Sequence, residues 1–118
     1  MTIRKFHVYT ADLNPRFGTE PGKIRPVVVV QSNLLNQEHP SVIIYPITTK
    51  VKLKAKLLRI HLKRGEAGLE SDSDIMVDQV RAIDKRRLRE HLGEISDKNK
   101  LFLLTSLRLL LLGTVVKL

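Results

Sequence analysis

Arg25 is the residue with the clearest chemical potential, because it precedes Pro26 and an unbroken apolar run at 27–30. The run consists of valines, which predict a strand buried on both faces, so Arg25 would be fixed at the strand's edge. A guanidinium held there can present its planar fork to two oxygens of a phosphate. Phe17 lies on the basic, glycine-containing loop before it, where a base could stack on the ring. In the competing interpretation, Phe17 folds into the core and Arg25 pairs with Glu20.

The rest of the sequence gives little support for a metal site or for a nucleophilic side chain. There is no cysteine, which excludes thiolate zinc sites and cysteine nucleophiles, and the four histidines lack metal-ligand spacing. Asp72, Asp74 and Asp78 would share one face of an extended strand and could hold Mg²⁺, although acids at strand ends are often simply solvated. Gly18 and Gly22 precede a strand rather than a helix, so they do not form a nucleotide-binding loop. We therefore expect neither a metal nor another cofactor.

Hydrophobic patterns and turn residues predict the elements that must position Arg25 and its loop. Expected strands cover residues 6–12, 25–31, 42–47, 57–62, 74–80 and 92–95, with residues 81–84 continuing the fifth strand past a bulge. The segments 14–23 and 32–40 contain turn residues and predict loops, the second with a helical turn around Leu34 and Leu35. A short helix is expected at 85–91.

One long helix is the strongest local prediction of the sequence. Ser96 or Asp97 can cap its start, and Gly113 ends it after about residue 112. Residues 109–112 are apolar nearly all round, so the helix must be covered on more than one side. We expect part of it to pack on a second copy of the chain, the alternative being a plain core helix. The expected fold class is α+β, a small, strongly bent antiparallel sheet or barrel with a long C-terminal helix.

Composition indicates a cationic globular protein. The 118 residues fit a single domain over 1–118, with 42% hydrophobic and 28% charged residues. A net charge of +9 favours an anionic partner, and residues 1–59 carry ten Lys or Arg against three acids. Four alternating lysines, expected on a solvated loop, add to this charge: Lys50, Lys52, Lys54 and Lys56. Without a signal segment or an apolar run of ~20 residues, we expect a cytoplasmic protein that does not enter a membrane.

Several motifs, in order, resemble the MazF/PemK (Kid) family of toxins from bacterial toxin–antitoxin pairs. The specific one spans residues 8–29 and reads Val-Tyr-x-Ala-Asp-Leu-Asn-Pro, then Gly-Thr-Glu-Pro-Gly-Lys, then Arg-Pro-Val-Val-Val. Shorter matches follow with the family's order and spacing, so the resemblance covers about residues 8–112. They lie at 46–49, 68–69, 72–73, 78–81, 83–85 and 87–88. One departure is that Phe6 and His7 stand where the family usually has glycine and an acid; His7 could alter the local charge or cap the strand.

The resemblance implies an SH3-like or CcdB-like barrel that works as a ribosome-independent, metal-independent endoribonuclease on single-stranded RNA, an mRNA interferase. The family's catalytic pair falls on Arg25 and Thr48. The RNA's own 2′-hydroxyl would attack, leaving a 2′,3′-cyclic phosphate and a 5′-hydroxyl. Arg25 would stabilise the developing charge and act as the acid, since a guanidinium with a pKa above ~12 is a poor base. Thr48 would orient the phosphate, and Glu20 would be the base or would orient Arg25.

The resemblance also implies partners. A homodimer would hold RNA in a groove across both subunits, and the acidic, disordered tail of a MazE-like antitoxin would occupy that groove. The residues lining the groove would be Phe17, Thr19, Glu20, Gln31 and Gln79, with the four lysines on the RNA backbone. Three alternatives stay open: a gyrase poison of the same fold, as in the CcdB branch; a non-catalytic nucleic-acid-binding module; and a metal-dependent nuclease that uses the three aspartates.

Overall fold

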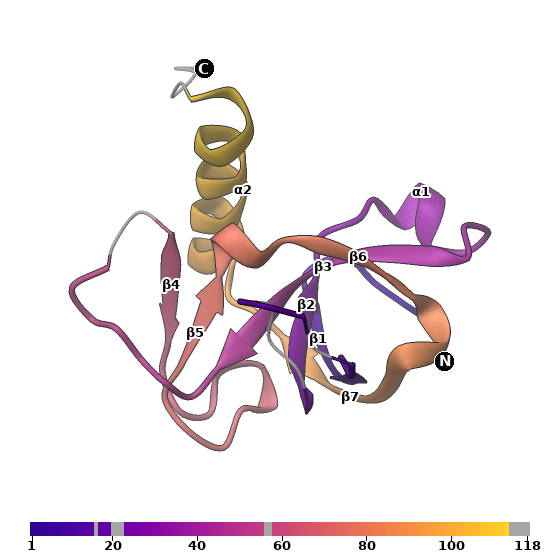
Figure 1. Ribbon diagram of the computed structural model, residues 1–118, viewed down its shortest axis with the longest axis horizontal. Helices are drawn as coiled ribbons and strands as arrows, with labels where there is room; N and C mark the ends of the chain where they lie inside the picture. Colours follow the sequence, from indigo (N-terminus) through magenta and orange to yellow (C-terminus); the bar gives the residue numbers. More distant parts are fainter. Residues whose placement is uncertain (16, 20–22, 56–57, 114–118) are drawn as a thin grey trace.

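The structure is a computed structural model that describes residues 1–15, 17–19, 23–55 and 58–113 (Figure 1). These residues form a seven-stranded sheet and a long helix that rises from it. The strands are β1 (His7–Asp12), β2 (Ile24–Val29), β3 (Ser41–Thr48), β4 (Arg59–Leu62), β5 (Ser73–Met76), β6 (Arg81–Asp84) and β7 (Leu88–Glu94). The α-helices are α1 (Asn33–Asn36) and α2 (Asp97–Leu112), and short 3₁₀ helices lie at η1 (Glu66–Gly68), η2 (Val77–Gln79) and η3 (Lys85–Arg87).

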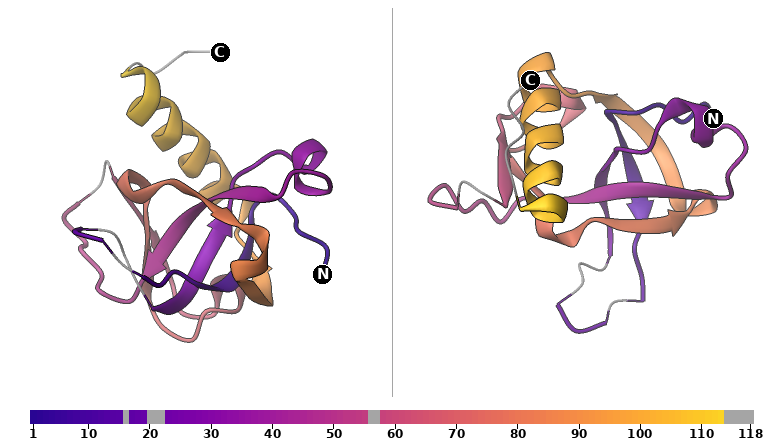
Figure 2. Two further views of the ribbon diagram at one scale, coloured as in Figure 1. Left: turned by 45° about the vertical axis from the view of Figure 1, so that its right-hand side comes forward. Right: turned by 90° about the horizontal axis from the view of Figure 1, so that it is seen from above.

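Strand β3 is where the sheet bends. The path of paired strands runs β4-β5-β3-β2-β1-β7, and β6 pairs with β3 beside that path. One edge of β3 therefore pairs with β2, while the other edge pairs with β6 at residues 41–44 and with β5 at residues 47–48. The strongly curved sheet is visible in Figure 2. The α+β class and the antiparallel pairing are confirmed, but the expected barrel is not closed, because β4 and β7 remain the two ends of the path.

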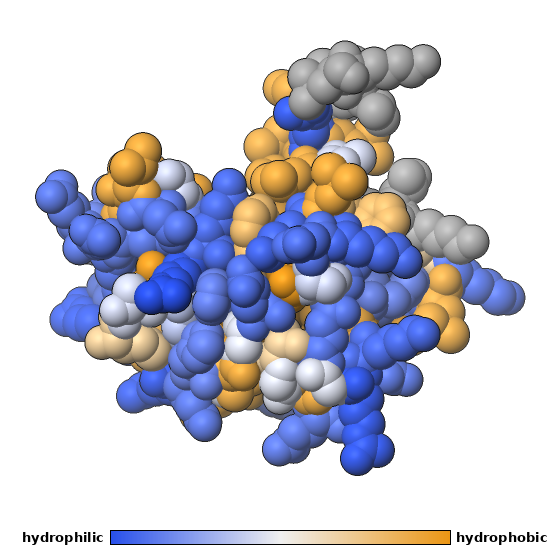
Figure 3. Space-filling view, turned by 180° about the vertical axis from the view of Figure 1, so that it is seen from behind, coloured by the Kyte–Doolittle hydropathy of each residue, from blue (hydrophilic) through white to orange (hydrophobic). Residues whose placement is uncertain are grey.

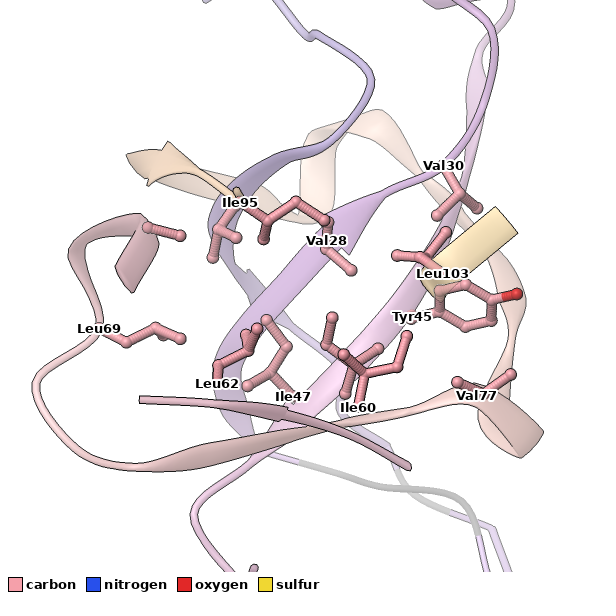
Figure 4. Packing of buried hydrophobic residues seen from close by; sticks show 13 residues of the cluster. Val28, Val30, Tyr45, Ile47, Ile60, Leu62, Leu69, Val77, Ile95 and Leu103 are labelled. Atoms are coloured by element: carbon pink, nitrogen blue, oxygen red, sulfur yellow. The ribbon is translucent and has the colours of Figure 1, made fainter. Parts of the chain in front are cut away.

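Both faces of the central strand β2 are buried, which explains its continuous run of valines. The even-numbered valines join a core cluster with Tyr45 and Leu103 (Figure 4). The odd-numbered valines join a second cluster on the opposite face, built mainly from β1 and β3. Successive residues of a strand point to opposite faces, so Arg25 lies on the face of the second cluster, at the end of the strand where that cluster stops.

Helix α2 begins and ends as the sequence predicts. Ser96 Oγ accepts a hydrogen bond from Asn99 N, and Gly113 adopts the left-handed backbone that favours glycine, with φ 68°. Its buried residues are Asn99 and Leu103, and Leu103 enters the core cluster in Figure 4. Several large apolar side chains of the helix are exposed instead: Leu101, Phe102, Leu104, Leu110, Leu111 and Leu112. One protomer therefore leaves much of the helix's apolar surface uncovered, and Figure 3 shows apolar atoms gathered along it.

Two expected elements differ in the structure. The helix predicted at 85–91 is wrong, because η3 covers only three residues and β7 follows at once. The partner of β7 is β1, more than seventy residues earlier, and the register shifts between these strands disturb the alternation of polar and apolar residues. The strand predicted at 74–80 is also shorter, since β5 ends at Met76 and η2 turns the chain toward β6.

Phe6 adopts a backbone conformation that normally belongs to glycine. Its φ is 70°, its N–H donates to Val29 O at 2.6 Å, and its carbonyl accepts from Ile95 N at 3.1 Å. The ring packs against the core cluster below α2. The next residue, His7, lies 2.9 Å from His91 Nε2 through its Nδ1 and 3.8 Å from a Glu94 carboxylate oxygen. The unusual pair at the start of β1 therefore combines a left-handed backbone at Phe6 with an aromatic contact to the core.

Candidate functional site

The register between β2 and β3 brings Arg25 and Thr48 together. The ladder pairs Val27 with Pro46, and continuing it by two residues places Arg25 opposite Thr48. Pro26 has no N–H to extend the ladder, so the paired region stops just before these two residues. Residues directly opposite each other in an antiparallel sheet share a face, with Cα atoms roughly 4.5–5.5 Å apart. On this register, the side chains of Arg25 and Thr48 point to the same face of the sheet.

The same row continues across the next two strands. Thr48 pairs with Asp74 of β5, and Asp74 pairs with His61 of β4. Because directly opposite residues share a face, the side chains of Arg25, Thr48, Asp74 and His61 form one polar row across the bent sheet. The sequence predicted the first two members as a site, but it did not predict that His61 and Asp74 extend it.

Arg25 is half-buried, and this burial lowers the pKa of its guanidinium from the ordinary value, because the charged form loses water. A less hydrated guanidinium attracts an anion more strongly than one in bulk water. Thr48 is the last residue of β3, and its Oγ1 accepts a hydrogen bond from Lys50 N at 3.1 Å. A hydroxyl that accepts one bond can still donate its own proton. The pair can therefore supply a cation and a neutral donor to one phosphate.

The loop between β1 and β2 leads directly into the strand that carries Arg25. Its base is closed by a bond from Leu13 N to Lys23 O at 2.9 Å and from Lys23 N to Asn14 Oδ1 at 2.8 Å. Phe17 is 69% exposed, so it does not fold into the core. Thr19 is also exposed. Glu20, the candidate base, lies outside the described residues.

The lysine-bearing loop is the segment between β3 and β4, and it follows Thr48 directly. It turns back on itself, because Ala55 N donates to Lys52 O at 3.0 Å, so the extended alternation is not formed. Lys50, Lys52 and Lys54 are exposed, and Lys56 lies outside the described residues. The loop therefore presents cations to solvent immediately after Thr48.

A buried acid fastens this loop, and sequence reasoning did not identify the arrangement. Asp74 Oδ2 accepts hydrogen bonds from Lys52 N at 2.8 Å and from Arg59 Nη1 at 3.2 Å. Its Oδ1 lies 2.5 Å from His61 Nδ1. Arg59 Nη1 also donates to Lys50 O at 3.2 Å. The signal in the sequence is weak, because the residue types suggest only that Asp74 belongs to a possible metal cluster.

One of the two glutamines expected in the groove, Gln31, lies elsewhere. Gln31 is buried beyond the far end of β2, where its Nε2 donates to Asn36 Oδ1 and to Ser41 O, both at 3.1 Å. It is six residues from Arg25, roughly 20 Å along extended chain, so the structure does not bring the two together. Gln79 is half-buried in η2, which packs against β3.

The three aspartates of the metal hypothesis are not brought together as ligands. Asp72 accepts a bond from Arg64 N at 2.8 Å, Asp74 is engaged by Arg59 and His61, and Asp78 is exposed in η2 rather than on the strand. Among the described residues, no cluster of three or more His, Asp or Glu could hold a metal. In the same part of the chain, no helix has the length and apolar character needed to cross a membrane.

Comparisons with known proteins agree on one family. The model of the PemK-like, MazF-like toxin of type II toxin–antitoxin systems matches residues 4–111. The Endoribonuclease MazF of Staphylococcus saprophyticus subsp. saprophyticus is 41% identical over 97 residues, which cover 81% of this chain and 80% of that protein.

Solved structures share the fold. The crystal structure of MazF from Deinococcus radiodurans superposes with a TM-score of 0.81 at 22% identity, covering 97% of this chain and 99% of that one. A MazE–MazF structure from the same organism gives a TM-score of 0.75 at 22% identity, covering 94% of this chain and 96% of that one. At such identities the likeness shows the fold alone.

Proposed function

The chain belongs to the PemK-like, MazF-like toxin family of type II toxin–antitoxin systems, and on that premise we propose that it is an endoribonuclease that cleaves single-stranded RNA. What carries the proposal is the β2–β3 register, which pairs Val27 with Pro46 and, continued by two residues, sets Arg25 opposite Thr48. A relative that is 41% identical and named an endoribonuclease supports the reaction class. The exposed lysines of the loop that follows Thr48 support an anionic substrate.

In the proposed reaction, the ribose 2′-oxygen attacks the adjacent phosphorus and the bond from phosphorus to the 5′-oxygen breaks. The products are a 2′,3′-cyclic phosphate and a 5′-hydroxyl. Negative charge grows on the non-bridging oxygens during the attack, and the half-buried Arg25 guanidinium is suited to stabilise it. Thr48 donates to the same phosphate and orients it.

Two proton transfers complete the reaction. The 2′-hydroxyl must lose a proton, and the leaving 5′-oxygen must gain one. Arg25 serves as the acid at the leaving oxygen, and Glu20 takes the 2′-proton or orients Arg25. An arginine is a poor base, so a carboxylate is the better candidate for the first transfer.

The RNA would run past both loops of this end of the sheet. Exposed Phe17 offers a ring on which a base can stack, and exposed Thr19 and half-buried Gln79 offer hydrogen bonds to base edges. The lysine-bearing loop offers contacts to the RNA backbone. Gln31 is left out of this groove, because its amide is engaged in a buried network.

The protein partners follow from two surfaces. The apolar residues along α2 are uncovered within one protomer, and this supports a homodimer in which a second copy covers the helix. The net charge of +9 supports an acidic antitoxin whose disordered segment folds over the RNA groove. A MazE–MazF structure is among those of the same fold.

Incubation of the purified protein with a long RNA in EDTA, followed by mapping of the cut ends, tests the proposal. We expect cuts at a short recurrent motif with cyclic phosphate and 5′-hydroxyl ends, and much slower cleavage with Arg25→Ala. Cleavage that EDTA abolishes would support the metal-dependent alternative, and RNA that is bound but left intact would support a non-catalytic binding module. A parallel gyrase assay tests the remaining alternative of the same fold.

A further inference from the structure

Asp74 is the one charged residue that is fully buried among the described residues, with 0% of its surface exposed. It lies next to Arg59 and binds the main chain of the lysine-bearing loop. A buried ion pair is weak support for stability, because its desolvation offsets much of the attraction. A carboxylate here would also repel an incoming phosphate unless neighbouring cations offset its charge. Its presence therefore calls for another physical reason.

Asp74 joins the candidate site to the loop that follows it. Through the register it is the cross-strand neighbour of Thr48, and through its Oδ2 it binds the main chain at Lys52. The Arg59 that it binds also donates to Lys50 O. Both ends of the segment 50–52 are thus fastened to the Asp74–Arg59 pair. Lys50 N in turn donates to the Thr48 hydroxyl, so the fastened segment also fixes that oxygen.

We propose that Asp74, together with Arg59, is a positioning residue of the RNA-cleaving site, which holds the Thr48 hydroxyl and the segment 50–52 in the geometry that the reaction needs. The inference rests on the proposed function. Displacement of a reacting group by about 1 Å can cost ~100-fold in rate, so a clamp of this kind affects kcat although it does not touch the substrate. His61 completes the clamp, because its Nδ1 occupies the second carboxylate oxygen.

A double-mutant cycle separates positioning from simple stability. With the full-length protein and RNA at saturation, Asp74→Asn should lower kcat by about 10- to 100-fold with a smaller change in KM. In a Thr48→Ala background, the same substitution should lower kcat by less than about threefold, because the hydroxyl that Asp74 positions is gone. A merely structural defect would reduce the rate by the same factor in both backgrounds, and that result would overturn the inference.

A matched control comes from the other end of β3. Val42 is fully buried on the same strand, six residues or roughly 20 Å from Thr48, so Val42→Ala should lower the melting temperature while kcat is retained. If Asp74→Asn does not fold by circular dichroism, Arg59→Met provides the cycle, with Arg59→Lys expected to restore part of kcat.

The outcomes distinguish the inference from the proposed function. Wild-type protein that cleaves RNA, beside an Asp74→Asn protein with unchanged kcat, would overturn the positioning role alone. Wild-type protein that leaves RNA intact would overturn both. Amide hydrogen exchange gives an independent readout. The Lys52 N–H should exchange faster in Asp74→Asn than in the wild type, and its exchange rate should be unchanged in Val42→Ala.

Discussion

Two loops flank the Arg25–Thr48 pair, and the protein holds them in different ways. The described bonds of the β1–β2 loop lie at its base, where Arg87 Nη1 also donates to the carbonyls of Asp12 and Asn14. The lysine-bearing loop is instead bound in its middle, through the main chain, to a buried acid. The first arrangement suits side chains that must adapt to a base, whereas the second suits charges that must stay at fixed places along a phosphate chain.

The largest expected effect comes from the residue that stands between the two loops. Arg25→Ala should lower the cleavage rate by roughly 100- to 1,000-fold, the usual cost of losing one donor to a developing oxyanion. Single-turnover cleavage of a short RNA measures it. Arg25→Lys keeps the charge without the planar fork, so its rate should lie between that of the wild type and that of Arg25→Ala. An alanine variant that kept most of its rate would contradict the role of Arg25.

The second-largest expected effect concerns the β1–β2 loop, which is bound at its base. Phe17→Ala should raise KM with little change in kcat, because a stacked base is worth about 1–3 kcal/mol of binding and does not take part in the chemical step. Phe17→Tyr retains a ring and serves as the control. A fall in kcat at saturating RNA, with KM unchanged, would contradict the distinction between the two loops.

The loop fastened by Asp74 should respond to salt. We propose to replace four lysines by glutamine: Lys50, Lys52, Lys54 and Lys56. The plot of the logarithm of the binding constant against the logarithm of the salt concentration should then have a shallower slope, by roughly 0.7 for each lost contact with single-stranded RNA. Fluorescence anisotropy with an uncleavable RNA measures the slope. Lys98→Gln, on α2 and outside both loops, should leave it unchanged. An unchanged slope in the fourfold variant would show that the lysines are only solvated.

The smallest expected effect lies outside both loops, at His7. Burial is the largest cause that lowers the pKa of His7, and Glu94 partly opposes it. A lowered pKa means that the unfolded chain binds more protons, so the free energy of unfolding should fall as the pH drops through about 6.5 and level off below the folded pKa. Melting temperatures between pH 7.5 and 5 should decline less for His7→Asn than for the wild type. His39→Asn, at an exposed histidine, is the control.

Local patterns in the sequence were sufficient for much of the fold. The valine run predicts β2 because both of its faces are covered, and Ser96 with Gly113 predicts the bounds of α2. The first part of β7 is predicted as a helix and only its end as a strand, because its pairing with β1 is distant in sequence and irregular in register. The positive φ of Phe6 was also unpredictable, since an aromatic residue disfavours that conformation and only the surrounding packing holds it there.

The candidate site was predictable only in part, for a similar reason. Arg25 and Thr48 are found from motifs, but their opposition depends on a register that the sequence does not display. Asp74 meets Arg59 and His61 only when β4 pairs with β5, so acids close in sequence suggested a metal site instead. Gln31 was expected at the groove because residue type alone does not reveal that a buried network uses its amide.

The central claim is that a ribose hydroxyl, aided by Arg25 and Thr48, breaks its own phosphodiester. The most direct test is a chimeric oligonucleotide that carries one 2′-deoxyribose on the 5′ side of a mapped cleavage position. The account predicts that the wild-type protein cuts the all-ribose strand there and leaves the chimera whole, although both bind equally. Cleavage of the chimera at that position, at a rate near that of the RNA, would contradict it.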